Sequence, residues 1–436
     1  MFSKRSRATR SRPFARGCEH RRFCRSPRVL MKLLLVHDSY QQRAGEDSVF
    51  EAERELLTSK GHRVLEYRRD NNEIQSYSTL RKLSLFGRTV WNSESYSDLA
   101  GIIDRERPDV AHFHNTFPLI SPSAYYACRA QGLPVVQTLH NYRLACPAAT
   151  FYRDGAICKE CVDRGLGRGV VHACYRASHA ATATVALMLA FHRWRRTWTN
   201  QVDCYLTLTQ FSSRQFIELG LPADKLFVKP NFLYSDPGVR KGSGESFVFV
   251  GRLSPDKGVR TLLRAWGTLQ TKIPLRIVGD GPLRTELESL KAAGNLEHVS
   301  LEGWKSRADV FEAIKGARAL VIPSEWYECF PMVIVEAFAA GVPVIASKLG
   351  AMAELVESGK TGLHFSPGND SHLAATVEWA LTHPEEMQAM GRLARTEYER
   401  KYTADRNHAL LMEAYRRAIA QHELTGGQGA EPLVAN

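Results

Sequence analysis

The chain has 436 residues, of which 44% are hydrophobic and 24% are charged. These values are typical of globular proteins, and the length suits two domains or three. They exclude a wholly disordered chain, a collagen-like protein and a small disulfide scaffold. The net charge of +12 raises the question of nucleic-acid binding.

Most of this charge lies in residues 1–30, which contain ten Lys and Arg residues against one acidic residue, Glu19. The segment therefore carries +9, and the other 406 residues carry only +3, which argues against bulk attraction of the folded part to DNA. Without apolar periodicity, residues 1–30 are predicted to be a basic disordered arm. Translation from Met31, a membrane-surface tether and a transit peptide remain open.

In the first half, short apolar segments alternate with helical patterns. The predicted strands are Lys32–Val36, Arg63–Tyr67, Val110–His114, Val135–Leu139 and Tyr205–Thr209, and the predicted helices include Asp47–Ser59, Leu99–Arg105 and Ser121–Arg129. The alternation predicts βαβ units around a parallel sheet. The apolar stretch Ala180–Phe191 is too short to span a bilayer. Because Trp194 and several arginines follow it, it is either a buried helix or a helix on anionic lipid.

The stretch Pro230–Glu245 is rich in proline, glycine and serine and is predicted to be a linker. After it, the alternation of strands and helices resumes. The predicted strands are Phe247–Val250, Leu275–Val278, Val299–Leu301, Ala319–Ile322 and Val344–Ala346. The predicted helices are Val259–Leu269, Leu283–Ala292, Ala308–Ala313, Met332–Ala340, Ala351–Ser358, Leu373–Leu381 and Ala404–Ala420.

This pattern predicts an α/β protein with two Rossmann-like domains that face each other across a cleft. Ligands are expected at the carboxyl ends of the strands, within that cleft. The predicted parts are the arm at 1–30, a first domain at 31–230, the linker at 231–245, a second domain at 246–402, a helix at 403–420 that returns to the first domain, and a disordered tail at 421–436.

The strongest functional signal is the segment from Glu328 to Glu336, ECFPMVIVE. Pro331 suits the first turn of a helix from about Met332 to Ala340, because its missing N–H would have no partner there. The start of such a helix attracts anions and suits a diphosphate. Glu336 can accept both hydroxyls of a ribose. Glu328 as a helix cap and Glu336 as a solvated side chain are the alternatives, which the apolar surroundings disfavour.

Two loops that follow strands in the second half also suggest nucleotide binding. GRLSPDKG, from Gly251, places the cations Arg252 and Lys257 in one loop, and this pair suits a pyrophosphate. Gly279, in VGDGP, marks either a tight turn or a direct contact with a nucleotide. Neither loop is a P-loop, and no G-x-G-x-x-G follows Val36, so nicotinamide chemistry loses its main support.

In the first half, two positions suit the opposite side of the cleft. Gly45 precedes a predicted helix, where its small size lets backbone amides approach a phosphate. His140, at the end of a predicted strand, suits a sugar hydroxyl or proton transfer, and a structural histidine is the alternative.

Together these motifs resemble the retaining nucleotide-sugar glycosyltransferases of glycosyltransferase family 4, which have the GT-B fold. The resemblance runs from about Met31 to Ala420 and is strongest from Phe247 to Gly368. It implies an acceptor-side first domain, a donor-binding second domain and no catalytic metal. It also implies front-face attack, in which the leaving phosphate helps to deprotonate the acceptor.

The resemblance implies roles for individual residues as well. Arg252 and Lys257 would bind the donor diphosphate, and Glu336 would hold the ribose. Glu328 would lie beside the donor sugar, and His140 would face the transferred sugar. The remaining donor-binding residues would be Gly45, which closes on the phosphates, Gly279, and the loop residues Phe330, Pro331, Met332 and Val333. Family members more often carry glycine at the positions of Glu46 and Pro331.

Four of the nine cysteines, Cys146, Cys158, Cys161 and Cys174, fall within 29 residues. A C-x-x-C pair with two outlying cysteines suits structural zinc or an iron–sulfur cluster, and free thiols are the alternative. A metal here would order the loop and take no part in catalysis.

The expected function is transfer of a sugar from a nucleoside diphosphate-sugar to a glycan or lipid-linked acceptor, in surface or extracellular polysaccharide synthesis. The expected location is the cytoplasm, with peripheral contact at the inner membrane face left open, and no specific nucleic acid is expected as a partner. The alternatives are a nucleotide-sugar epimerase on the same fold and a nucleic-acid-binding protein that uses the basic arm.

Overall fold

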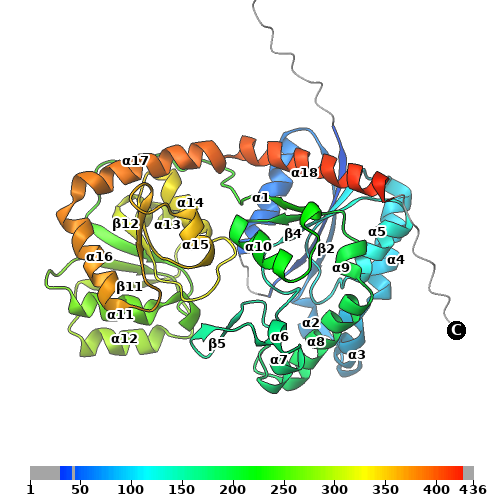
Figure 1. Ribbon diagram of the computed structural model, residues 1–436, viewed down its shortest axis with the longest axis horizontal. Helices are drawn as coiled ribbons and strands as arrows, with labels where there is room; N and C mark the ends of the chain where they lie inside the picture. Colours follow the sequence, from blue (N-terminus) through cyan, green and yellow to red (C-terminus); the bar gives the residue numbers. More distant parts are fainter. Residues whose placement is uncertain (1–29, 42–44, 426–436) are drawn as a thin grey trace, which may run out of the picture. The chain divides into compact units, whose positions relative to one another are not determined.

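The computed structural model describes residues 30–41 and 45–425 (Figure 1). Almost all of the predicted arm at 1–30 and most of the predicted tail at 421–436 lie outside the described residues. The described residues contain two six-stranded sheets, and all strand pairs within both sheets are parallel. The predicted fold class is confirmed.

The first sheet has the order β2-β1-β3-β4-β7-β8, and we call it and its helices the amino-terminal lobe. Its strands are β1 (Lys32–Ser39), β2 (Arg63–Asp70), β3 (Val110–Asn115), β4 (Val135–Leu139), β7 (Cys204–Thr207) and β8 (Leu226–Val228). Its helices are α1 (Gly45–Ser59), α2 (Glu73–Ser76), α3 (Thr79–Val90), α4 (Ser93–Glu106), α5 (Ser123–Ala130), α8 (His179–Trp194), α9 (Thr197–Asn200) and α10 (Gln210–Glu218).

The second sheet has the order β11-β10-β9-β12-β13-β14, and we call it and its helices the carboxy-terminal lobe. Its strands are β9 (Ser246–Val250), β10 (Leu275–Val278), β11 (Val299–Gly303), β12 (Ala317–Ile322), β13 (Val344–Ser347) and β14 (Gly362–Phe365). Its helices are α11 (Val259–Thr268), α12 (Arg284–Ala293), α13 (Arg307–Lys315), α14 (Met332–Ala339), α15 (Gly350–Leu355), α16 (Asp370–Thr382) and α17 (Pro384–Lys401).

The last helix, α18 (Ala404–Leu424), follows α17 and packs on the amino-terminal lobe, where it is drawn in red in Figure 1. Its buried residues Leu411, Tyr415 and Ala418 join a core cluster with Leu33 and Leu206 of the first sheet. The helix therefore returns to the first sheet, and it extends four residues beyond the predicted end at 420.

Between β4 and α8 lies a segment that the apolar pattern did not resolve, residues 146–174, which we call the cysteine segment. It contains a hairpin of β5 (Tyr152–Arg153) and β6 (Ala156–Ile157), and two short helices, α6 (Glu160–Asp163) and α7 (Gly167–Val171). Two-residue strands and four- or five-residue helices have too little periodicity to be recognised in a sequence.

The apolar stretch Ala180–Phe191 forms most of α8, which has a buried face and an exposed face. Val185, Met188 and Leu189 are buried, whereas Leu187 and Trp194 are exposed. Within residues 30–41 and 45–425, no helix combines the length and the hydropathy needed to cross a bilayer.

Candidate functional site

A glycine allows the loop after β9 to pack closely against the loop before α14. Gly258 has a φ of +67°, and a Cβ atom there would lie 1.9 Å from the Pro323 carbonyl oxygen. Only glycine permits this approach. Lys257 Nζ then lies 2.6 Å from Glu328 Oε1, and Ser324 Oγ donates to the same oxygen at 2.9 Å. Two residues predicted to act on the donor thus form a largely buried ion pair.

The helix that follows this pair is α14, which begins at Met332. Pro331 precedes the helix as its cap residue and is not part of the first turn. Phe330 and Pro331 are buried, whereas Met332 and Val333 are half-buried. Because the first amides of a helix have no intrahelical acceptor, the N–H groups of Met332 and Val333 are available to an anion.

Glu336 lies farther along α14, on a half-buried position. Burial raises the pKa of its carboxyl group, and the positive charge of Arg307 acts in the opposite direction. Arg307, the first residue of α13, also lines a cavity shared by the two lobes. A half-buried carboxylate suits a pair of ligand hydroxyls.

Arg252 and Gly279 line a separate cavity of about 630 Å³ in the carboxy-terminal lobe. Gly279 has a φ of +140°, and a Cβ atom there would lie 1.9 Å from the Gly251 carbonyl oxygen, so the tight-turn reading of Gly279 is sufficient. The exposed Trp304 and the neighbouring Lys305 line the same cavity. A cavity lined by an aromatic ring and two cations suits a nucleobase with its phosphates.

The amino-terminal lobe contributes residues that lie close to Glu328. Burial raises the pKa of the Cys329 thiol, and the charges that act on it include Glu328 from its own loop and Glu46 from α1. Burial also raises the pKa of Tyr142, and Cys329 and Glu328 raise it further. Glu46 follows Gly45, the first residue of α1, so the start of this helix lies near the loop before α14.

Glu46 is itself a buried carboxyl group. Burial and then the neighbouring Asp47 raise the pKa of Glu46 to about 8, although hydrogen bonds with Tyr40 and Asn141 act against this. Asn141 Nδ2 donates to Glu46 Oε2 at 3.4 Å, and Glu46 Oε1 has no hydrogen-bond partner. Burial therefore favours the protonated form of Glu46.

His140 follows β4 and belongs to a chain of buried side chains. Its Nε2 atom lies 3.1 Å from His114 Nδ1, and His114 Nε2 lies 3.5 Å from Glu53 Oε2. Glu53 Oε1 accepts a hydrogen bond from Lys229 Nζ. Burial, with the charges of His37 and Lys229, lowers the pKa of His140 to about 3. His140 is therefore neutral near pH 7.

Glu53, His112 and His114 are a trio whose ligand atoms lie within 4.8 Å of one another. The remaining contacts do not fit a metal ion. Lys229 places an ammonium group on the Glu53 carboxylate. His112 already uses both nitrogens, Nδ1 with Tyr415 at 2.9 Å and Nε2 with Thr138 at 2.8 Å. The trio is therefore a hydrogen-bonded core network.

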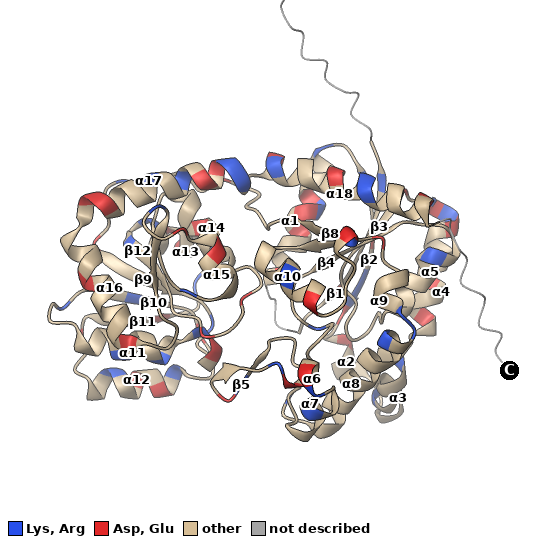
Figure 2. Ribbon diagram, viewed as in Figure 1, with Lys and Arg blue, Asp and Glu red and all other residues tan. Residues whose placement is uncertain are grey.

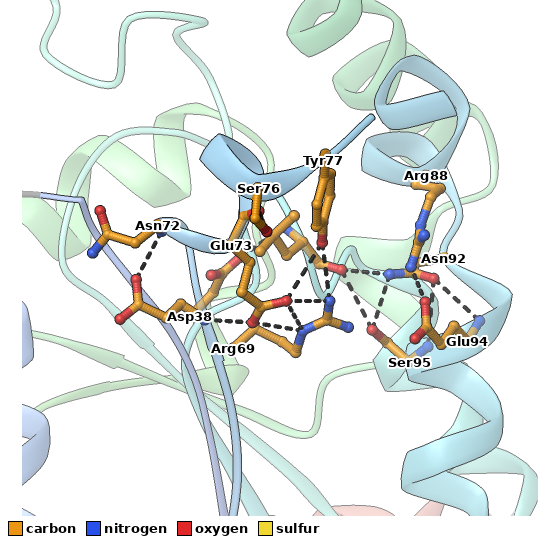
Figure 3. Close-up of polar contacts among 12 residues, drawn as sticks. Asp38, Arg69, Asn72, Glu73, Ser76, Tyr77, Arg88, Asn92, Glu94 and Ser95 are labelled. Carbon is orange, nitrogen blue, oxygen red and sulfur yellow. Dashed lines mark hydrogen bonds and ion pairs between the residues drawn. The ribbon is translucent and has the colours of Figure 1, made fainter. Parts of the chain in front are cut away.

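The cavity shared by the lobes has a volume of about 890 Å³. On the amino-terminal side it is lined by His37, Asp47, Arg69, Asn72 and Glu73, among others. Figure 3 shows the contacts around Arg69 and Glu73: Arg69 donates to Glu73 at 2.7 Å, and the Tyr77 hydroxyl lies beside both. A wall of paired charges and amides suits a polyhydroxylated ligand.

The four predicted metal-ligating cysteines lie together in the cysteine segment, and all four are free thiols. Cys146 and Cys161 are buried, whereas Cys158 and Cys174 are partly exposed.

Sequence reasoning missed several of these residues. Trp304 and Tyr142 carry no motif, and Lys229 pairs with Glu53 across 176 residues of sequence. One usable signal was the run of polar residues at the ends of the amino-terminal strands, because parallel strands bring those ends to one edge.

Two protein-family models match the chain. Residues 235–397 match the glycosyl transferases group 1, and residues 15–231 match the glycosyl transferase 4-like domain. Among curated relatives, D-rhamnosyltransferase WbpZ of Pseudomonas aeruginosa is 34% identical over 161 residues, which is 36% of this chain and 42% of WbpZ. The matches to the first curated relatives span between 19% and 56% of the relatives' own length.

Solved structures show the same fold. Anabaena HepE in complex with UDP-glucose has a TM-score of 0.62 at 18% identity, over 88% of this chain and 99% of HepE. Sucrose-phosphate synthase from Thermosynechococcus elongatus has a TM-score of 0.66 at 18% identity, over 89% of this chain and 99% of that chain. The two family models together cover most of the sequence, and the chain belongs to the group 1, family-4-like glycosyltransferases with the GT-B fold.

Proposed function

We propose that this protein transfers a sugar from a nucleoside diphosphate-sugar, with retention, to a glycan or lipid-linked acceptor in polysaccharide synthesis. The observation that carries the proposal is the Lys257–Glu328 pair at the start of α14, with Tyr142 and Glu46 of the other lobe beside it. The carboxy-terminal lobe holds the donor, and the amino-terminal lobe holds the acceptor.

Stabilisation of the leaving diphosphate is the main task of the carboxy-terminal lobe. An ammonium group has three donors, so Lys257 can keep Glu328 in place while it binds a phosphate oxygen. The amides of Met332 and Val333 and the guanidinium of Arg252 add donors to the same anion. Charge stabilisation of this kind, by one preorganised group, contributes roughly 3–4 kcal/mol to a transition state.

Glu328 and Glu336 have different roles in this proposal. Glu328, held by Lys257 and Ser324, lies beside the donor sugar. Glu336 binds the ribose hydroxyls, and the cavity that Trp304 and Lys305 line holds the nucleobase. As the bond from the sugar to the phosphate breaks, the leaving phosphate oxygen takes the proton of the acceptor hydroxyl, and this hydroxyl oxygen bonds to the same face of the sugar.

His140 acts in this proposal as a neutral hydrogen-bond acceptor. Glu53 Oε2 lies 3.5 Å from His114 Nε2, and the negative charge of this carboxylate favours a proton on that nitrogen. His114 Nδ1 then accepts from His140 Nε2–H at 3.1 Å. This leaves a lone pair on His140 Nδ1, which suits a hydroxyl group of the transferred sugar. Glu53 and His114 are positioning residues that set this tautomer.

An exposed face of α3 and α8 supports a membrane-associated acceptor. Leu80, Leu83 and Phe86 of α3 and Leu187 and Trp194 of α8 are exposed, and a shallow apolar groove lies between the two helices. The exposed cations on or beside these helices are Arg81, Lys82, Arg193 and Arg196. Neither helix contains an acidic residue (Figure 2). Apolar side chains among cations suit an anionic lipid surface.

Vesicle sedimentation tests this face. The protein is expected to bind vesicles rich in phosphatidylglycerol and to leave phosphatidylcholine vesicles in the supernatant. Leu83→Glu with Phe86→Glu should lower the bound fraction at least about tenfold, since a charge on an apolar face opposes burial. Leu290→Glu with Leu393→Glu is the matched control, because both leucines are exposed in the carboxy-terminal lobe. Equal binding by the two double variants would contradict the proposal.

A panel of UDP-, GDP-, ADP- and TDP-sugars tests the function itself. One family of donors should raise the thermal unfolding midpoint, and product analysis with acceptor should then show transfer with retained configuration. Incubation with donor alone separates this reaction from epimerisation, because an epimerase changes the sugar without any acceptor. No stabilisation by any nucleotide sugar would count against both enzyme readings.

A further inference from the structure

The cysteine segment is strained and has little regular structure of its own. The described chain has ten non-glycine residues with positive φ, and six of them lie in or just after this segment: Ala149, Phe151, Asp154, Ala173, Arg176 and Ala177. Such conformations cost of order 1 kcal/mol each and persist only where the surroundings enforce them. Two-residue strands and short helices supply few hydrogen bonds for that purpose.

The segment is gathered around one residue, Gly169. A Cβ atom on Gly169 would lie 3.1 Å from Cys161 Sγ and 3.1 Å from Cγ of Pro147, the neighbour of Cys146. The backbone N–H of Cys174 donates to the Gly169 carbonyl at 3.1 Å. Gly169 therefore lies in contact with Cys161, with Cys174 and with the residue next to Cys146.

The hairpin brings in the fourth. Cys158 follows β6, and its N–H donates to the Phe151 carbonyl at 2.7 Å. Helix α6 then carries Cys161 three residues on. Cys161 is buried, and the other three thiols, Cys146, Cys174 and Cys158, lie close enough to interact with it electrostatically.

We propose that Cys146, Cys158, Cys161 and Cys174 bind one zinc ion as four thiolates. Sulfur atoms around tetrahedral zinc lie at about 2.3 Å from the metal. Among described residues, the only group whose ligand atoms lie mutually within 4.8 Å is Glu53, His112 and His114. No three of the four thiols lie that close together, so zinc binding requires them to move toward one another.

Binding also exchanges protons for metal. Each thiol loses its proton to solvent as its sulfur bonds to the zinc, so the site releases up to four protons. The four thiolates and the zinc together carry two negative charges. Arg153, which hydrogen-bonds Cys174 and acts on Cys158, is the adjacent cation.

The position of this segment gives the metal a structural consequence. Burial raises the pKa of the Tyr152 phenol, and Glu325 and Asp256 of the carboxy-terminal lobe raise it further. Lys159 Nζ lies 5.9 Å from the centre of the Tyr327 ring, next to Glu328. A zinc ion would therefore fix the part of the amino-terminal lobe that contacts the donor loop.

Metal analysis of the full chain tests the proposal without any reliance on activity. The protein, expressed in medium with added zinc, should contain about one zinc per chain by elemental analysis, and so should Cys128→Ser and Cys204→Ser. These two variants are matched controls, since Cys128 in α5 and Cys204 in β7 are buried free thiols elsewhere in the lobe. Cys161→Ser should lose at least about nine-tenths of the zinc.

A second measurement keeps the test valid if Cys161→Ser fails to fold. Wild-type protein stripped by chelator and reductant should take up one zinc, with protection of four thiols from alkylation. Three outcomes would overturn the proposal. The wild type could remain free of zinc, with the four thiols reactive toward alkylation. It could instead contain a disulfide between any two of the four cysteines, or show the absorption band of an iron–sulfur cluster near 400 nm.

Discussion

The two lobes build their parts of the site in different ways. In the carboxy-terminal lobe, the residues that we propose bind the donor come from loops that directly follow strands, so Lys257 and Glu328 lie within recognisable motifs and meet at 2.6 Å. In the amino-terminal lobe, the corresponding side chains are scattered. Glu53, His114 and Lys229 come from three distant segments and meet only in the folded chain.

The difference follows from the two tasks. A diphosphate requires the same arrangement of cations and amides whatever sugar it carries, and one loop with one helix start can supply that arrangement. An acceptor is recognised by hydroxyl groups in a pattern specific to each acceptor, and a cavity lined by many segments suits it. We therefore expect substitutions in the carboxy-terminal lobe to lower activity more than substitutions in the amino-terminal lobe.

Lys257→Ala should have the largest effect. Loss of the ammonium leaves the leaving diphosphate and Glu328 without their shared cation, so kcat/KM should fall by about 10²–10³-fold. The stabilisation by donor in thermal unfolding should disappear, as it should in Glu336→Ala. Lys272→Ala, an exposed lysine in the same lobe, is the control and should change neither quantity. Unchanged stabilisation in both site variants would refute the donor site.

Gly258→Ala should have the next largest effect, on stability. Its Cβ atom would lie 1.9 Å from the Pro323 carbonyl oxygen at a φ of +67°, so the loop must move. We expect a loss of about 2–4 kcal/mol in the free energy of unfolding, measured with urea. Gly267→Ala, in α11 with open space around it, should instead gain about 0.5–1 kcal/mol. A loss of the same size in both would show that the contact with Pro323 is unimportant.

His140→Ala should lower kcat/KM by about 10-fold, the worth of one hydrogen bond to the sugar. His140→Gln, which keeps a hydrogen-bond acceptor, should recover part of this loss. His114→Phe should resemble His140→Ala and should also shift the ¹⁵N resonances of His140 between tautomers. If the ¹⁵N resonances of His140 in His114→Phe equal those of the wild type, His114 does not set the tautomer of His140.

Glu46→Gln should change the pH dependence of the free energy of unfolding. The folded-state pKa of Glu46 is about 8, above the ordinary value of 4.5, so the folded protein binds this proton more tightly than the unfolded chain. Wild-type stability should therefore fall between about pH 5 and pH 8, and the variant should lack this part of the decline. Thermal unfolding of both proteins from pH 5 to pH 9 measures it. Parallel curves would contradict a buried, protonated Glu46.

The same comparison explains what the sequence could predict. Ten of the twelve strands of the two sheets follow from contiguous patterns, as for Val344–Ala346 within β13, and so do the loops that carry Lys257 and Glu328; β8 and β14 were not predicted. Helix α17 was missed although Met387, Met390, Ala394 and Tyr398 are buried at helical spacing, because its mean hydropathy is low and its other residues are charged. β14 was missed because a four-residue strand with one glycine has little signal.

The amino-terminal part of the site lies beyond such patterns. His140 was a candidate because it ends a strand, but its neutral state depends on burial among His37, His114 and Lys229. Neither Glu53 nor Lys229 carries a motif, since their pairing arises when α1 and the chain after β8 pack together. Tertiary packing, which sequence spacing does not encode, sets these properties.

A crystal structure with a bound nucleoside diphosphate would show directly whether Lys257 and the start of α14 bind the diphosphate. The account predicts phosphate oxygens within hydrogen-bond distance of Lys257 Nζ and of the Met332 and Val333 amides, with the ribose on Glu336. A nucleotide bound away from α14, with Lys257 still engaged only by Glu328, would contradict it.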